Sequence, residues 1–295
     1  MTQDTNLYEI LLYYIYTDIN DPQTLRLEQL ELCQKLNLKG RIIISDEGLN
    51  GTVAGLKEDT QSYVDACQAD ELLHLMEFKR SEGVEDAFPN LNIKVRNEIV
   101  SGKLRDDDVN PNRVTGNRLA PKDLKKWFKE NKDFTIVDMR NSYEYELGHF
   151  KGSIDPGMRR FEDLPQKILA LESLKDKTVL TVCTGGVRCE KASGYLVKKG
   201  FKNVYQLDGG IVSYMEQFPG EDFDGSLFVF DKRRTIHFNG ENHKAIATCI
   251  YCKNTSERFT NCKKSSCNAK LVACTDCVES GSKRLCPECE TKVVA

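Results

Sequence analysis

The chain has 295 residues, a formal net charge of −3 and 40% hydrophobic residues. This length suggests about two domains, and the near-neutral charge excludes a globally basic nucleic-acid binder, so an RNA partner needs a local basic patch. No apolar run reaches the roughly 18–20 residues that span a bilayer, and the first residues lack the pattern of a signal peptide. We therefore expect a cytoplasmic protein without a membrane partner.

The first segment, residues 1–100, is predicted to be an α+β domain. Strands are expected at 8–16, 40–45, 51–54 and 92–96, and helices at 22–36 and 58–69. The order β-α-β-β-α-β is typical of a ferredoxin-like or acylphosphatase-like sandwich. Cys33 and Cys67 lie in the two predicted helices, where we expect them to be packing residues.

Residues 101–118 are polar and rich in turn formers, which indicates a linker or a long connection.

The second segment, residues 119–225, alternates short strands with helices. Strands are expected at 135–138, 179–182 and 204–207, and helices at 121–129 and 190–199, the latter followed by Gly200. This alternation predicts a parallel, doubly wound α/β sheet.

A predicted strand delivers Cys183 to a short loop with two glycines, Cys183-Thr-Gly-Gly-Val-Arg188, and a helix follows. Glycines let consecutive backbone N–H groups turn toward one point, the helix adds its positive N-terminal end, and Arg188 adds a permanent charge. All three favour the thiolate, so we predict a reactive Cys183 assisted by Arg188. The alternative is a buried cysteine that acts as a small apolar residue.

Other polar residues of this segment have two interpretations. Asp138, Arg140 and His149 resemble acid–base groups, but pairing within the scaffold is the favoured interpretation. Cys189, just after the loop, is either a resolving thiol or a residue of the first helical turn. No Walker loop or dinucleotide-binding glycine motif is present, so no organic cofactor is evident, and no two-His-one-carboxylate spacing indicates non-haem iron.

The third segment, residues 235–295, is dense in cysteine and poor in large apolar residues, so metal is the expected means of stabilisation. Its paired cysteines are predicted ligands: Cys249, Cys252, Cys262, Cys267, Cys274, Cys277, Cys286 and Cys289. Eight thiolates suit two tetrahedral zinc ions, with an iron–sulfur centre or disulfides as alternatives. The pairs can share ions in sequential or interleaved order. Nearby basic runs, Lys232–Arg234 and Lys263–Lys264, can contact phosphates or serve only as a solubilising surface.

The loop from Cys183 to Arg188, with Asp138-Met-Arg140 and Gly148-His-Phe-Lys-Gly152 upstream, resembles a rhodanese domain. Together with the stretch at 40–55, Phe228-Val-Phe-Asp231 and the cysteine-rich tail, it makes nearly the whole chain resemble the bacterial tRNA uridine hydroxylases. The resemblance implies oxygen-dependent formation of 5-hydroxyuridine at the wobble position of tRNA. It also implies that Cys183 is the persulfide-forming or nucleophilic residue and that molecular oxygen is the co-substrate. The implied partners are the anticodon region of tRNA and an electron donor that is unknown.

A flipped anticodon base needs phosphate contacts near the loop, and the candidate residues are Arg41, Lys79, Arg80, Lys94 and Arg96.

Three other functions compete with hydroxylation. One is a sulfurtransferase that carries sulfur as a Cys183 persulfide. Another is a phosphatase, although Cys183-x4-Arg188 is one residue shorter than the phosphatase loop. The third is a zinc-stabilised RNA-binding adaptor in which the thiol is redundant.

Overall fold

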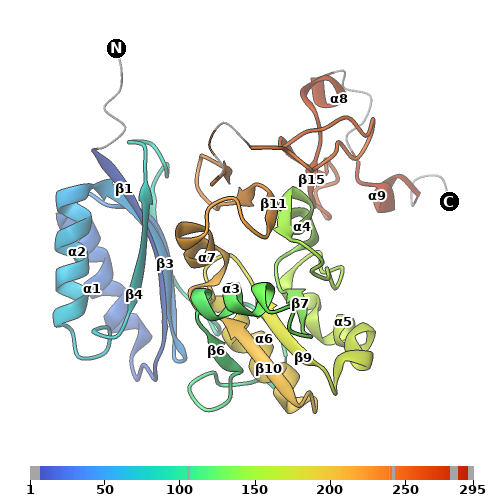
Figure 1. Ribbon diagram of the computed structural model, residues 1–295. Coiled ribbons are helices and arrows are strands. Elements are labelled where there is room, and N and C mark those ends of the chain that lie inside the picture. Colours follow the sequence, from blue (N-terminus) through green and yellow to red (C-terminus); the bar gives the residue numbers. More distant parts are fainter. Residues whose placement is uncertain (1–6, 105–106, 239, 241–242, 280–284, 292–295) are drawn as a thin grey trace.

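The computed structural model describes residues 7–104, 107–238, 240, 243–279 and 285–291. Figure 1 shows an N-terminal sheet with two helices, a central sheet flanked by helices and a small C-terminal unit next to α4 of the central domain. No helix in these ranges is both long and apolar enough to cross a membrane.

The N-terminal domain is a five-stranded sheet of order β4-β1-β3-β2-β5. Its elements are β1 (Tyr8–Tyr16), α1 (Pro22–Lys35), β2 (Lys39–Ser45), β3 (Gly48–Leu56), α2 (Lys57–Ala69), β4 (Glu77–Glu82) and β5 (Leu91–Val95). The first four strands form the βαββαβ unit, which confirms the ferredoxin-like or acylphosphatase-like prediction.

Three details of that prediction were wrong. The fourth strand of the unit is β4, which was not predicted because its residues are mostly polar and show no hydrophobic pattern. The strand that was predicted as the last one is β5, an additional edge strand that runs parallel to β2. Strand β3 begins at Gly48 rather than at residue 51, because a two-residue turn brings Ser45 directly opposite Gly48.

The two faces of this sheet have different neighbours. Leu11 and Tyr13 of β1 are fully buried in the core that α1 and α2 cover. The alternate residues, Ile10, Leu12 and Tyr14, therefore lie on the other face. Figure 1 shows α1 and α2 on the side away from the central domain, so this second face is the one turned toward it.

The central domain contains a four-stranded sheet of order β6-β10-β9-β7, parallel throughout, which confirms the predicted doubly wound sheet. Its elements are β6 (Asn117–Leu119), α3 (Pro121–Lys129), β7 (Thr135–Asp138), α4 (Ser142–Leu147), β8 (Gly148–Phe150), η2 (Phe161–Asp163), α5 (Leu164–Lys167), η3 (Ile168–Leu174), β9 (Thr178–Val182), α6 (Val187–Lys198), β10 (Asn203–Leu207), α7 (Gly210–Gln217) and β11 (Phe223–Gly225). Strand β6 begins inside the predicted connection 101–118, and α6 begins three residues before the predicted 190.

Successive side chains along the buried strands point to opposite faces of this sheet, so each face has its own core. Val137 and Val179 contribute to the core under α6, while Ile136 and Leu180 contribute to the core under α3 and α7. Gly200 follows α6 with φ of +88°, the left-handed conformation that a helix end favours in glycine.

The N-terminal sheet docks onto the start of α6. The Tyr14 hydroxyl donates to Glu190 at 3.3 Å, and the Tyr16 hydroxyl donates to the Val187 carbonyl at 3.2 Å. The fully buried ammonium of Lys191 lies 2.9 Å from a carboxylate oxygen of Glu47. These polar contacts hold the second face of the N-terminal sheet against the loop that precedes α6.

The C-terminal part consists of short elements around cysteines. They are β12 (Leu227–Phe228), β13 (Thr235–Ile236), β14 (Phe259–Asn261), β15 (Lys270–Val272), α8 (Thr275–Glu279) and α9 (Pro287–Thr291). Strands β12 and β13 pair, and we call residues 227–236 the β12–β13 hairpin. A small apolar cluster of Leu147, Phe228, Ala247 and Val272 packs the cysteine-rich unit onto α4 and this hairpin.

Candidate functional site

Cys183 directly follows β9 and is fully buried. The backbone N–H of Gly186 donates to its sulfur at 3.2 Å. Gly186 has φ of +105°, a backbone conformation that L side chains rarely adopt. The glycine therefore lets the loop turn its amide back toward the sulfur just before α6 begins.

The environment of Cys183 favours its ionised form. Burial opposes ionisation, but hydrogen bonding from the Cys189 thiol, the charge of Arg188 and the backbone N–H groups of Cys189 and Gly186 outweigh it. Together they lower the pKa of Cys183 to about 6. Burial and the neighbouring sulfur raise the pKa of Cys189, so that thiol keeps its proton. Cys189 lies in the first turn of α6, as one of its two interpretations predicted, and it supports the thiolate.

Arg188 is held by the carboxylate of Glu144. Its guanidinium donates to the two carboxylate oxygens of Glu144 at 2.8 and 2.9 Å and to the Thr184 hydroxyl at 3.2 Å. Glu144 is fully buried; burial raises the pKa of its carboxyl, but Arg188 outweighs that and lowers it. The spacing of Asn141 and Glu144 is that of a helix capping box, a signal for a helix start but not for this ion pair.

The other polar residues of this region make scaffold contacts. The Arg140 guanidinium donates to Asp138 at 2.6 to 3.1 Å, and both side chains are fully buried. The His149 ring stacks on Tyr145 with centroids 4.0 Å apart, and its Nδ1 lies 2.8 Å from the Tyr145 carbonyl. None of these four residues lines the cavity that contains Cys183.

A cavity of about 380 Å³ lies between the N-terminal sheet, the Cys183 loop and the β12–β13 hairpin. This volume falls in the range of small-molecule pockets, about 300–1,000 Å³. Leu12, Arg41 and Lys79 line it from the N-terminal sheet, and Phe230 and Arg233 line it from the hairpin. Three parts of the chain that are far apart in sequence thus enclose one cationic, largely apolar space.

Access to the sulfur is restricted by the N-terminal sheet. Cys183 belongs to the cavity wall but has no exposed surface. Leu12 and Tyr14 press on the loop: a Cβ atom added at Gly185 would lie 2.9 Å from Leu12 Cδ2, and one at Gly186 would lie 2.7 Å from Tyr14 Oη. A reagent that reaches the sulfur therefore requires side chains of this sheet to move.

The eight cysteines of the C-terminal unit form two groups of four. Cys249 and Cys252 meet Cys274 and Cys277, while Cys262 and Cys267 meet Cys286 and Cys289, with the ligand atoms of each group within 4.8 Å of one another. The order is interleaved, which decides between the two arrangements that the spacing left open.

The sulfur distances suit metal ligands rather than disulfides. Cys252 and Cys274 have sulfurs 3.6 Å apart, and Cys267 and Cys286 have sulfurs 3.7 Å apart. A disulfide needs about 2.05 Å, whereas four sulfurs at 2.3 Å around one tetrahedral zinc ion lie about 3.8 Å from one another. Both groups can therefore hold a metal ion.

Three protein-family models match consecutive parts of the chain. They are the UPF0176 acylphosphatase like domain over residues 8–99, the rhodanese-like domain over 120–217 and the rhodanase C-terminal region over 224–290. The tRNA uridine(34) hydroxylase of Shouchella clausii is 42% identical over 286 residues, which cover 96% of this chain and 88% of that protein. Proteins of the same name from Cytophaga hutchinsonii (42% identical, 96% of this chain and 90% of that protein) and Staphylococcus haemolyticus (44%, 90% and 83%) are also similar.

The chain belongs to the tRNA uridine(34) hydroxylase family. This membership confirms the resemblance that the sequence motifs indicated, including the acylphosphatase-like and rhodanese-like domains.

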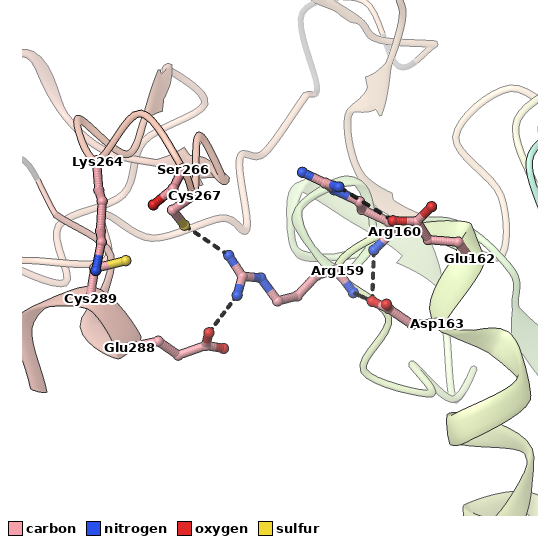
Figure 2. A pocket seen from close by; sticks show the side chains of 9 residues that line it. All are labelled: Arg159, Arg160, Glu162, Asp163, Lys264, Ser266, Cys267, Glu288 and Cys289. Carbon is pink, nitrogen blue, oxygen red and sulfur yellow. Dashed lines mark hydrogen bonds and ion pairs between the residues drawn. The ribbon is translucent and has the colours of Figure 1, made fainter. Parts of the chain in front are cut away.

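In this member of the tRNA uridine(34) hydroxylase family, the central domain also reaches the second cysteine group. Figure 2 shows Arg159 extending between Cys267 and Glu288. Its guanidinium donates to the Cys267 sulfur at 3.1 Å and forms an ion pair with Glu288. A cation at this place would partly offset the negative charge of four clustered thiolates.

One cluster was not predicted from spacing. The structure brings together His237, His243 and Glu257, and the Ser226 hydroxyl lies 3.0, 3.2 and 2.6 Å from them. His243 Nε2 also lies 3.1 Å from Glu257, so these side chains form a hydrogen-bonded network around Ser226. The two histidines and the glutamate can together hold a metal ion, although their spacing in the sequence did not indicate such a site.

The predicted RNA-contacting residues of this hydroxylase family member separate into two groups. Arg41, Lys79 and Arg80 line the Cys183 cavity, whereas Lys94 and Arg96 lie outside it on or next to β5. Arg80 is held by Glu9 at 2.7 Å. In the basic run at 232–234, Lys232 pairs with Asp86 and Arg233 pairs with Asp231.

Proposed function

We propose that this chain hydroxylates the wobble uridine of tRNA at C5 and that Cys183 is its nucleophile. The observation that carries the proposal is 42% identity over 96% of the chain to a tRNA uridine(34) hydroxylase. The proposed role of Cys183 is supported by its place in the wall of an enclosed cavity and by the lowered pKa of its thiol. The role of tRNA as substrate is in keeping with the cytoplasmic location that the sequence predicts.

The proposed chemistry begins with the Cys183 thiolate. Its sulfur forms a bond to C6 of the uracil ring, and the electron pair of the C5–C6 double bond moves toward O4, which makes C5 nucleophilic. C5 then bonds to an electrophilic oxygen. Loss of the C5 proton and departure of the sulfur from C6 restore the ring and the thiolate. The positive charge of Arg188 near the loop stabilises the negative charge that moves between sulfur and ring.

The proposed source of the oxygen atom is molecular oxygen. Replacing C5–H by C5–OH with O₂ reduces the second oxygen atom to water, which requires two electrons and two protons from an external donor. We propose no organic cofactor within the chain.

We propose zinc in both cysteine groups, as structural ions. All-thiolate tetrahedral sites of this kind are typical of structural zinc. Cys249, Cys252, Cys274 and Cys277 would hold one ion, and Cys262, Cys267, Cys286 and Cys289 the other. Each ion would tie together segments that have few apolar residues to pack.

Nucleoside mass spectrometry of tRNA from cells with and without the gene tests the proposed activity. We expect 5-hydroxyuridine to disappear on deletion, to return with the wild-type gene and with Cys67→Ala, and to stay absent with Cys183→Ser. Growth under ¹⁸O₂ should raise the mass of 5-hydroxyuridine by two units relative to unmodified uridine from the same cells, whereas growth in H₂¹⁸O under ordinary oxygen should label both nucleosides equally. Full tRNA modification by the Cys183→Ser variant would exclude Cys183 as the nucleophile.

The competing functions give different results. A sulfurtransferase would transfer sulfur from thiosulfate to cyanide at high rate and need no O₂ for tRNA modification. An RNA-binding adaptor would keep modification after loss of Cys183 and lose it after loss of the cysteine-rich unit. A phosphatase requires the loop arginine to be free for phosphate, whereas Arg188 is bound at two points by Glu144.

A further inference from the structure

Three basic side chains from three parts of the chain have no ion-pair partner in the part of the chain that the structure describes. They are Arg41 on β2, Arg234 at the end of the hairpin turn and Lys270 on β15. Within the described ranges none of the three forms an ion pair, and none is among the residues with a further unprinted interaction. Neighbouring cations differ in this respect, since Arg80, Lys232 and Arg233 each have a carboxylate.

The β12–β13 hairpin brings the three cations together. Arg41 lines the Cys183 cavity together with Val229 and Ile236 of the hairpin. The Val229 N–H donates to the Arg234 carbonyl at 2.9 Å, which closes the turn. Lys270 Nζ lies 4.5 Å from the ring centroid of Phe228, and Phe228 pairs with Thr235, the residue after Arg234.

Electrostatics supports this placement. Burial lowers the pKa of Lys270, and the positive charges of Arg234 and Arg41 lower it further, against the opposing effect of Glu144. Like charges held within reach of one another destabilise the unliganded protein. The rings of Phe228 and Tyr143 offer Lys270 only partial compensation through cation–π contacts. An anion from outside the chain would remove the repulsion.

An exposed aromatic ring beside these cations indicates which anion. Phe230 lies on the same turn, lines the Cys183 cavity and is 46% exposed. Cations next to an exposed aromatic ring are typical of surfaces that bind single-stranded RNA, because the ring stacks on an unpaired base while the cations bind phosphates. A free phosphate ion would use the cations alone.

We propose that Arg41, Arg234 and Lys270 bind backbone phosphates of the substrate RNA beside the Cys183 cavity and that Phe230 stacks on an unpaired base. The proposal rests on the proposed tRNA substrate and adds where the RNA lies. It makes the cysteine-rich unit part of the substrate-binding surface, because its metal-stabilised fold positions Lys270.

Binding of a fluorescent anticodon stem-loop RNA to the full-length protein, measured by anisotropy at several KCl concentrations, tests this surface. We expect Arg41→Gln, Arg234→Gln and Lys270→Gln each to weaken binding severalfold and to reduce the slope of log K against log[KCl] by about 0.7. Lys270→Arg should restore most of the affinity. Phe230→Ala should weaken binding without changing the salt slope, since it removes no charge. The matched control is Lys129→Gln, an exposed lysine in the last turn of α3 that lies outside the cluster.

Metal content and the midpoint of urea unfolding, unchanged in each variant, show that the fold is intact. Wild-type affinity and salt slope in the three glutamine variants would overturn the inference even if cells still require the gene for 5-hydroxyuridine. An equal loss in Lys129→Gln would also overturn it, because binding would then depend on diffuse charge. A loss of RNA affinity confined to the three glutamine variants would support the proposed surface. If the cells then showed no gene-dependent 5-hydroxyuridine, that result would count against the proposed activity but not against the RNA-binding surface.

Discussion

Arg188 and Glu144 form a two-point ion pair next to the Cys183 loop, with nitrogen–oxygen distances of 2.8 and 2.9 Å. Glu144 is fully buried and Arg188 is 8% exposed. The pair fixes the first turn of α6 to the start of α4, so the loop geometry around the sulfur depends on a residue about 40 positions upstream.

Removing the Glu144 charge should destabilise the protein strongly. Glu144→Gln leaves the Arg188 guanidinium buried without its counter-charge, which typically costs about 3–5 kcal/mol. Urea unfolding followed by circular dichroism measures the loss. The matched control is Glu172→Gln, which removes the partner of Lys175 in an exposed pair and should cost less than about 1 kcal/mol. A Glu144→Gln variant as stable as this control would contradict the importance of the pair.

The reactivity of Cys183 should titrate near pH 6. Its lowered pKa means that the thiolate fraction, and hence the alkylation rate, is nearly constant above neutral pH and falls as the pH drops through about 6. Arg188→Gln removes a positive charge and should move the midpoint upward. Iodoacetamide labelling followed by peptide mass spectrometry gives the profile, with Cys189 as an internal control that stays unmodified because its pKa is raised. A Cys183 midpoint above pH 8 would contradict the assignment.

Double cysteine variants should report the interleaved pairing. Cys249→Ser combined with Cys274→Ser damages one group and should leave one metal ion per chain, measured by inductively coupled plasma mass spectrometry. Cys249→Ser combined with Cys262→Ser damages both groups and should leave none. Sequential pairing would give the opposite result for the two variants.

The contact of Leu12 with Gly185 should limit what the loop tolerates. Gly185→Ala places a Cβ atom 2.9 Å from Leu12 Cδ2, so the Leu12 side chain or the loop must shift, and we expect a severalfold loss of tRNA modification rate. Leu12→Ala removes the obstructing atom, and the double variant should recover most of the rate. If the double variant is as slow as Gly185→Ala alone, the contact with Leu12 is not the cause.

Local sequence was sufficient to predict the elements that carry strong patterns. The alternation in β1, the proline at the start of α3 and the strand–glycine–helix order around Cys183 each reflect short-range stereochemistry. Strand β4 was missed because an edge strand with polar side chains on both faces has no hydrophobic period.

Family motifs extended the prediction to function, because the Cys183 loop, the upstream signatures and the cysteine-rich tail occur together in one chain. The spacing of the cysteines predicted a metal unit but could not choose the pairing, since both orders satisfy the same tetrahedral geometry. Only the fold, which places Cys249 against Cys274 rather than Cys262, decides it.

The sequence by itself determined the fold classes of the three domains and the position of Cys183 between a strand and a glycine loop. Both depend on patterns within a few residues. Tertiary structure alone decided that Glu144 holds Arg188 in place and that Leu12 and Tyr14 cover the loop. It also decided that Arg41, Arg234 and Lys270 converge without an ion-pair partner among the described residues. The physical reason is that burial and electrostatic interaction depend on distance in space, and residues far apart along the chain meet only after its domains have packed.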